Sequence, residues 1–376
     1  MAAAVEHHWP KDASLSGIVI TRYGHTLPNE RIRVVEAGHP VPDASGEAAA
    51  HEIFTSVQAL GEDDLLLALV SGGGSSLLSL PMEGIPMADL KEVTRKLLMC
   101  GATIQEINTV RKHISAIQGG RLAAACKARI LCLVISDVTG DDPTHIASGP
   151  CAPDPSTFAD AVRILARYAI EAPASVAGHL AKGMRGQSPE TPKPGDAVFA
   201  RTENRVIATA HRSLDAAAAV FRERGISAAI LGDSITGEAK EVGKVMAAIA
   251  REIRSHGAPF RPPVALISGG ECTVTVRAGG RGGRCSEFLL SLGIELGGMA
   301  SIHAIAADTD GIDGSEDNAG ALLSPDSLHR AESAGLNATD LLSANDAWGF
   351  FSGIGDLVKT GPTLTNVNDY RAILIQ

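Results

Sequence analysis

The stretch Leu65-Leu-Leu-Ala-Leu-Val70 runs directly into Ser71-Gly-Gly-Gly-Ser-Ser76. A short apolar run that ends in glycines predicts a strand buried on both faces, as in a parallel sheet covered by helices. Glycines after such a strand let backbone N–H groups approach an anion, and a helix that begins there adds the positive end of its dipole. The stretch therefore predicts an α/β fold, with either a phosphate- or carboxylate-binding turn or a plain tight turn after the strand.

The same alternation of apolar runs and amphipathic stretches continues along the chain. In the first half, the predicted strands cover 17–21, 33–36, 65–70 and 130–136, and the predicted helices cover 44–60, 87–99 and 103–118. In the second half, the predicted strands cover 205–209, 228–231, 264–267, 272–276 and 302–306, and the predicted helices cover 213–224 and 238–255. Thr103 and Glu106 form a predicted capping box, and Gly119-Gly120 is a predicted helix stop.

This order of elements and the length of 376 residues predict two α/β domains with mostly parallel sheets flanked by helices. The segment 183–195 is rich in glycine and proline and poor in core-forming residues, which predicts a linker or a domain edge. We therefore expect one domain over 1–195 and a second over 196–376.

Composition limits the classes of function that are open to the chain. A net charge of −10 offers no basic face for nucleic acid. The six cysteines form no CxxC pair, which is typical of free thiols in a reducing compartment. No apolar stretch approaches the roughly 18 to 20 residues of a membrane helix, and the first residues lack the pattern of a signal peptide. We therefore expect a cytoplasmic protein with neither nucleic acid nor a membrane as partner.

Acidic residues follow several of the predicted strands. They are, in chain order, Asp137, Asp141, Asp142, Glu271, Asp308 and Asp310. Ligands of open α/β sheets bind beyond the carboxyl ends of the strands, so carboxylates there are well placed for Mg²⁺ or for a substrate hydroxyl. For the first three residues, a polar Asx turn closed by proline is the structural alternative.

Two arginines, Arg281 and Arg284, stand in a glycine-rich stretch between these acid-bearing strand ends. They can grip oxyanions in forked geometry, although a flexible hairpin with solvated arginines is the alternative. Anion-binding turns, carboxylates for Mg²⁺ and arginines for charge on a moving phosphoryl group together indicate phosphoryl transfer.

Other sequence patterns argue against competing chemistries. The chain contains no GxxxxGK[ST] loop, no GxGxxG turn after a strand, no GxSxG elbow and no HExxH pair. Residues 307–314 are superficially similar to a calcium loop, but Ile312 stands where an oxygen ligand is needed.

Several long motifs in the same order resemble the class II glycerate 2-kinase family over nearly the whole chain. The N-terminal motifs are Ser71-Gly-Gly-Gly-Ser-Ser76, the stretch 101–113 with Gly119-Gly-Arg-Leu122, and Ser136-Asp-Val-Thr-Gly-Asp-Asp-Pro143. The second half is similar to that family's MOFRL region, about 264–370, in Ser268-Gly-Gly-Glu271, Gly280-Arg-Gly-Gly-Arg284, the stretch 307–314 and the stretch 361–369.

The resemblance implies transfer of the γ-phosphate of ATP to the 2-hydroxyl of D-glycerate, with Mg²⁺, in a cleft between the two domains. Proteins of this kind are also labelled hydroxypyruvate reductases, so an NAD(P)H-dependent reductase is one alternative. A protein that binds glycerate or ATP without turnover is another. Assembly as a homodimer is left open.

The resemblance also suggests roles for individual residues. Arg284 is expected to stabilise the transferring phosphoryl group, Asp310 to orient or deprotonate the glycerate hydroxyl, and Asp137 and Glu271 to lie near Mg²⁺ or the nucleotide. The residues expected to bind the nucleotide or its phosphates are Ser71, Gly72, Gly73, Gly74, Ser75, Ser76, Glu271, Arg281, Asp308 and Asn366.

The chain departs from the family pattern in two places. Members usually begin with a strand, a turn containing a Gly-Lys-Ala step and a helix, and Met1-Ala-Ala-Ala-Val-Glu6 resembles the last turns of that helix. This sequence is therefore expected to lack that strand and the turn with its lysine. After the arginines, Cys285-Ser286-Glu287 replaces the usual Asn-Gln-Glu, which removes two amide side chains.

Overall fold

The computed structural model describes residues 1–138 and 140–376 and divides into two compact units, Met1–Ile207 and Ala208–Gln376. Each unit is described by itself. The break between them comes later than the expected boundary after residue 195. Segment 183–195 is largely irregular, as expected of its composition, but it packs on the first unit, where the buried Thr191 donates a hydrogen bond to Asp154 at 3.0 Å.

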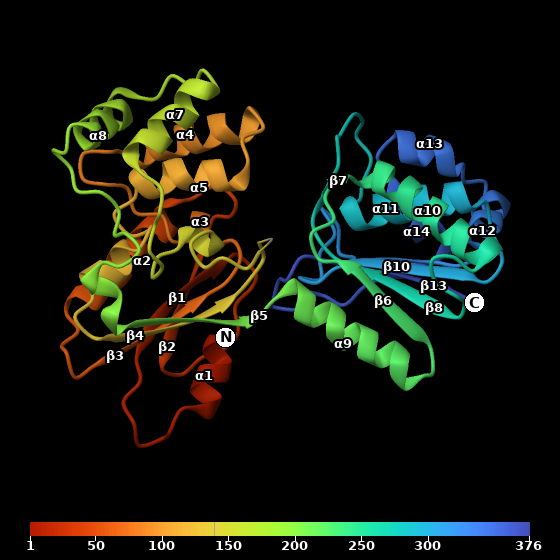
Figure 1. Cartoon of the computed structure of the whole chain (residues 1–376), viewed down its shortest axis with the longest axis horizontal. Coiled ribbons are helices and arrows are strands. Elements are labelled where there is room, and N and C mark those ends of the chain that lie inside the picture. The colour runs from red at the N-terminus through yellow and green to blue at the C-terminus, as the bar shows by residue number, and fades with distance from the viewer. Residues whose placement is uncertain (139) are drawn as a thin grey trace. The chain divides into compact units, whose positions relative to one another are not determined.

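The first unit contains parallel strand pairs and helices on both sides of them (Figure 1). Its elements are α1 (Ala2–His8), β1 (Gly17–Arg22), β2 (Ile32–Ala37), α2 (Ala44–Gln58), β3 (Leu65–Val70), α3 (Gly74–Leu77), α4 (Met87–Met99), α5 (Ile104–His113), α6 (Arg121–Ala125), β4 (Arg129–Ile135), η1 (Ile146–Ser148), α7 (Phe158–Arg167), α8 (Ala174–Met184), η2 (Ala197–Arg201) and β5 (Thr202–Ala208). One sheet has the order β3-β4-β5, and β1 pairs with β2 separately.

The predicted strand 65–70 is confirmed as β3, which pairs in parallel with β4. Every second residue of β4 is buried, and Ile130, Cys132 and Val134 share one core cluster with Val70 of β3 and Val57 of α2. This core cluster therefore packs against the strand up to the residue at which the turn begins.

The helices α4, α5, α7 and α8 form a second core in this unit, built on residues such as Leu90, Val110 and Phe158. The capping box of Thr103 and Glu106 is confirmed at the start of α5. The predicted stop at Gly119-Gly120 is wrong, because α5 already ends at His113. The chain beyond it pairs with the segment before α4 through the bridge Pro81↔Ser115, and this tertiary pairing ends the helix early.

The second unit is one sheet with helices on both faces. Its elements are α9 (Ala210–Glu223), β6 (Ser227–Gly232), β7 (Gly237–Glu238), α10 (Ala239–His256), β8 (Val264–Ser268), β9 (Cys272–Thr273), α11 (Arg284–Leu296), β10 (Ile302–Asp308), β11 (Gly320–Leu323), α12 (Ser327–Ser333), α13 (Ala338–Ser343), α14 (Ala347–Ile354), β12 (Leu357–Val358) and β13 (Asp369–Ile375). The strand order is β12-β11-β10-β13-β8-β6, and β7 pairs with β9 separately.

The two faces of this sheet carry different side chains of the same strand. In β8, Val264 and Leu266 belong to the core beneath α10 and α11, whereas Ala265 and Ile267 belong to the cluster beneath α9. Figure 1 shows α9 on one face and α10 and α11 on the other. Successive residues of a strand point to opposite faces, so a strand covered on both sides is apolar throughout.

The predicted α/β class with helix-flanked sheets is confirmed, and β1–β2, β3–β4 and β6–β8 pair in parallel. The rest of the second sheet differs from a parallel arrangement, because β13 is antiparallel to both β8 and β10, and β11 is antiparallel to β10 and β12. The chain passes from β10 to β11 without a helix between them, and such short connections join antiparallel strands, whereas a parallel pair needs a longer crossover.

Two further expectations concern the whole chain. All six cysteines are free, as predicted. Among residues 1–138 and 140–376, no helix combines the length and the apolar character that crossing a membrane requires.

Helices α10 and α11 pack closely because Gly243 lacks a side chain. A Cβ at this position would lie 2.6 Å from the carbonyl oxygen of Phe288 and 3.0 Å from Cβ of Ser291. We expect Gly243→Ala to lower the free energy of unfolding by about 1–3 kcal/mol, because the added methyl group forces the helices apart.

Gly178 of α8 is the matched control, because a Cβ there meets no atom within 4 Å. Gly178→Ala should raise the free energy of unfolding by up to about 1 kcal/mol through helix propensity. Urea unfolding followed by circular dichroism measures both. Equal behaviour of the two variants would mean that the α10–α11 contact is not tight.

Candidate active site

The centre of the second unit's candidate site is a pair of carboxylates on neighbouring strands. Asp308 is the last residue of β10 and Asp369 is the first residue of β13, and the antiparallel register makes them direct partners. Side chains of directly opposed residues lie on the same face of a sheet. The register thus places two carboxylates side by side where two adjacent strands of the second unit's sheet end and begin.

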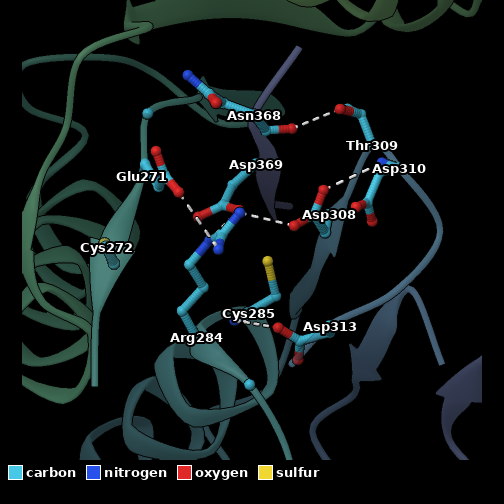
Figure 2. Close-up of polar contacts among 12 residues, drawn as sticks. Glu271, Cys272, Arg284, Cys285, Asp308, Thr309, Asp310, Asp313, Asn368 and Asp369 are labelled. Carbon is cyan, nitrogen blue, oxygen red and sulfur yellow. Dashed lines mark hydrogen bonds and ion pairs between the residues drawn. The ribbon is translucent and has the colours of Figure 1, made fainter. Parts of the chain in front are cut away.

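Arg284, the first residue of α11, joins these carboxylates (Figure 2). Its Nη2 donates to Oδ2 of Asp308 at 2.6 Å, and its Nε donates to Oδ1 of Asp369 at 2.8 Å. Its Nη1 lies 3.5 Å from Oε1 of the half-exposed Glu271. The predicted residues Arg284, Asp308 and Glu271 are therefore brought together, on a rigid base formed by a helix end and two strand ends.

Arg371 supports the cluster through a second contact with Asp369. This buried side chain donates from Nη2 to the second oxygen of Asp369 at 2.8 Å, and its Nη1 donates to the carbonyl oxygen of Gly269 at 3.4 Å. Asp369 and Arg371 were not predicted as site residues. Asp369 is the last residue of the motif 361–369. An arginine within the apolar run 370–375 is the signal that could have pointed to a buried ion pair.

The charges of the site shift each other's protonation. Burial raises the pKa of Asp308 to about 7; Arg284 opposes this rise, and the nearby carboxylates of Asp310 and Asp369 add to it. Burial lowers the pKa of Arg284, but the carboxylates of Asp369, Asp308 and Glu271 outweigh it and raise that pKa above its usual value. The cluster thus holds more carboxylates than cations around one permanently charged guanidinium.

The loop after β10 carries Asp310. Its backbone N–H donates to Oδ1 of Asp308 at 3.0 Å, and its own Oδ1 accepts the N–H of Ile312 at 2.8 Å. Thr309 ties the same loop to the C-terminal segment by donating from Oγ1 to the carbonyl oxygen of Asn368 at 2.7 Å. Asp310 is therefore fixed next to the arginine-bearing cluster, as its motif suggested (Figure 2).

Asp313 explains how α11 begins at Arg284. Its carboxylate accepts the backbone N–H groups of Cys285 at 2.9 Å and Ser286 at 2.8 Å, together with the Ser286 hydroxyl. A Cβ at residue 283 would lie 2.3 Å from Oδ1 of Asp313, so the approach requires Gly283. Burial raises the pKa of this carboxyl. The serine that replaces a family amide thus serves the helix start.

Two predicted residues have other contacts. The guanidinium of Arg281 stacks over the ring of Trp348, with 3.9 Å from its carbon to the ring centroid, and makes no ion pair with any residue that the structure describes. Oδ1 of Asn366 accepts the backbone N–H of Asn368 at 2.8 Å, which shapes a turn next to Asp369. Neither side chain joins Arg284 directly.

The remaining predicted residues lie in the first unit. The stretch Ser71–Ser76 follows β3 as a turn whose last residues are already the start of α3, and the carboxylate of Asp137 lies against it, since a Cβ on Gly72 would be 2.2 Å from Oδ2. Gly73 adopts a φ of 77° and is approached by Nε2 of His39, which the sequence did not single out. Asp137 and the turn are therefore neighbours.

No group of three or more His, Cys, Asp or Glu side chains is arranged around a common metal position within residues 1–138 and 140–376. Mg²⁺ usually takes one or two protein carboxylates and completes its shell with water and substrate phosphates. The expected metal roles of Asp137 and Glu271 stay predictions.

Two helix-flanked units, one of them holding an arginine among carboxylates at the ends of two strands, define an α/β protein with a candidate active site. Residues 1–181 match the family described as "Domain of unknown function (DUF4147)", and residues 264–369 match the MOFRL family. The chain belongs to the class II glycerate 2-kinase family.

The similar proteins carry two kinds of name, hydroxypyruvate reductase and glycerate kinase. The chain is similar to a "Putative hydroxypyruvate reductase" of Agrobacterium vitis, at 54% identity over all of this chain and 84% of the relative. It is 41% identical to the "Glycerate 2-kinase" of Pyrococcus horikoshii over 94% of this chain and 80% of the relative. The crystal structure of glycerate kinase from Thermotoga maritima superimposes with a TM-score of 0.86 at 39% identity, covering 96% of this chain and 85% of that one.

The raised pKa of Asp308 predicts a pH-dependent stability. The unfolded chain holds this proton with a pKa of about 3.9, so the folded protein binds it more tightly between about pH 4 and 7. The free energy of unfolding should therefore fall as pH rises through this window, by roughly 1–4 kcal/mol. Asp308→Asn keeps the acceptor for Arg284 and should lack this part of the slope. Urea unfolding at pH 5 and pH 8 measures the difference; identical slopes would contradict the shift.

Proposed function

We propose that this chain phosphorylates D-glycerate at its 2-hydroxyl, using ATP as donor and giving 2-phosphoglycerate. The observation that carries the proposal is the forked arginine Arg284, held at a sheet edge by Asp308 and Asp369 next to the loop of Asp310. Glycerate kinases among the relatives support the substrate. Phosphoryl transfer needs positioned charge more than covalent chemistry, and this site supplies positioned charge.

Within this proposal, Arg284 binds equatorial oxygens of the transferring phosphoryl group through the N–H groups that its hydrogen bonds to Asp308 and Asp369 leave over, and it keeps its charge at any working pH. Asp310 orients the hydroxyl of the acceptor or takes its proton. Its carboxylate is already fixed by the N–H of Ile312, which reduces the ordering needed when substrate binds.

The surplus of carboxylates favours a divalent cation as part of the donor. A nucleotide polyphosphate would be repelled by Asp308, Asp310 and Glu271 unless its charge were reduced, and Mg²⁺ bound to the phosphates does this. Glu271 and Asp137 stay the residues proposed to lie near Mg²⁺ or the nucleotide, each within its own unit. The proposed cytoplasmic location and any homodimer remain separate predictions.

A reductase is the second candidate, favoured by the names of the Agrobacterium vitis relatives. It requires NAD(P)H, yet the turn after β3 reads Ser71-Gly-Gly-Gly-Ser-Ser76 and lacks the spacing of a dinucleotide-binding turn. Quenching of NADPH fluorescence on mixing with the protein, followed by oxidation of NADPH with hydroxypyruvate, would favour this reading.

Phosphorus NMR separates the candidates directly. The protein is incubated with MgATP and D-glycerate, and in parallel with MgATP alone. A 2-phosphoglycerate resonance that needs both substrates supports the kinase. Its absence, with ATP left intact and glycerate shown to bind by calorimetry, would identify a binding protein without turnover.

Arg284→Lys tests the fork without removing the charge. We expect kcat to fall by about 100-fold or more, because an ammonium cannot make the parallel hydrogen bonds of a guanidinium. The thermal midpoint should also fall, because a lysine cannot replace both hydrogen bonds to Asp308 and Asp369, so kcat is measured well below the midpoint of the variant. Arg251→Lys is the matched control, as Arg251 faces the surface and lies 3.9 Å from Glu295. Equal kcat values in the two variants would remove Arg284 from the mechanism.

A further inference from the structure

The first unit contains a buried arginine whose charge is not balanced. Arg111 of α5 is only 8% exposed, yet it makes no ion pair with any residue in 1–138 or 140–376. Burial lowers its pKa to about 10, with no opposing effect from a neighbouring carboxylate. An unpaired buried charge is strongly unfavourable, so a site of this kind is expected to have a partner that completes it.

The neighbouring residue on the same helix has the opposite arrangement. Lys112 is 1% exposed, but its Nζ lies 3.4 Å from Oδ1 of the equally buried Asp154. Asp154 is in turn held by the hydroxyls of Ser156 and Thr191. The buried cation Lys112 thus has its partner within the structure, whereas the buried cation Arg111 does not. Lys112 has the contacts of a structural residue, and Arg111 has those of a ligand-binding residue.

The guanidinium of Arg111 remains open to a ligand. Its Nη1 donates to Oδ1 of Asn108 at 2.9 Å. Its Nε and Nη2 have no hydrogen-bond partner in the described chain, but solvent still reaches them. In Arg121, by contrast, Nε and Nη2 have no partner and are buried from solvent. Two N–H-bearing nitrogens of a positioned guanidinium suit the two oxygens of a carboxylate or a phosphate.

Hydrogen bonds connect Arg111 to the glycine-rich turn after β3. Oδ1 of Asn108 also accepts the hydroxyl of Ser148 at 3.1 Å, and that hydroxyl lies 2.8 Å from Oγ of Ser75. Nε2 of Gln118 donates to the carbonyl oxygen of Ser75 at 2.9 Å, which fixes the same turn. Asp137 approaches the other end of the turn, at Gly72.

We infer that Arg111 and the Ser75 end of this turn form a receptor for a small oxyanion, either the carboxylate of a hydroxy acid or a phosphate group of a nucleotide. Asn108 and Ser148 act as positioning residues, since they hold the guanidinium and the Ser75 hydroxyl in one network. The choice of these two sources rests on the proposed kinase function, whereas the receptor itself does not.

Calorimetry on the full chain tests the receptor and identifies its source. Wild type and Arg111→Met are titrated separately with D-glycerate, with inorganic phosphate and with ATP. If Arg111→Met binds only glycerate at least tenfold more weakly than wild type does, the ligand group is the carboxylate. If it instead binds phosphate and ATP at least tenfold more weakly, the ligand group is the phosphate. Equal affinities of wild type and variant for all three, or no binding of any of them to wild type, would overturn the inference.

The thermal midpoint without ligand distinguishes a ligand-binding role of Arg111 from a purely structural one. Arg111→Met removes an unbalanced charge, so its midpoint without ligand should not fall below that of wild type. Lys112→Met, which strands Asp154, should melt several degrees lower. Arg163→Met controls for the substitution itself, because Arg163 lies on the surface beside Asp160. A midpoint of Arg111→Met as low as that of Lys112→Met would assign Arg111 to structure alone.

The outcome is independent of the phosphorus NMR result. A wild-type protein that binds phosphate through Arg111 but makes no 2-phosphoglycerate would keep the receptor and remove the kinase. If wild type makes 2-phosphoglycerate and Arg111→Met has the same turnover and the same affinities, the kinase is kept and the receptor is removed.

Discussion

The pairing of Asp308 with Asp369 across β10 and β13 is the constraint on which the second unit's site depends. Two carboxylates that face each other on neighbouring strands repel unless a cation lies between them, and Arg284 provides that cation from the end of α11. Arg371 takes the remaining oxygen of Asp369. This register thus determines where the two carboxylates lie, and with them the direction in which the guanidinium of Arg284 points.

This arrangement balances stability against function. A buried ion cluster is weak evidence for stability, because the cost of removing charges from water offsets much of their attraction. Here the cluster fixes geometry: Asp313 anchors the first turn of α11, and Asp308 anchors the loop that carries Asp310. The charged groups are ordered before any ligand arrives, which lowers the entropy that binding must overcome.

Local pattern predicted the fold where local forces dominate. The run 65–70, the helix Met87–Met99 and the capping box at Thr103 are confirmed because an apolar period or a side-chain cap defines each of them. The start of α11 was not predicted, since a glycine-rich stretch predicts a flexible loop until Asp313 binds its N–H groups. The motifs identified Arg284, Asp308 and Glu271, but Asp369 and Arg371 depend on a strand register that no local pattern reveals.

The position of β13 has a consequence for how the second unit is made. This strand follows every other strand in the sequence, yet it lies between β10 and β8 in the middle of the sheet. During synthesis, β8 and β10 must wait with unpaired edges until residues 369–375 have emerged, and such edges invite pairing with other chains. The central pairing of the sheet, and with it the cluster around Arg284, therefore forms late, so the emerging unit has most need of chaperones just before its chemistry becomes possible.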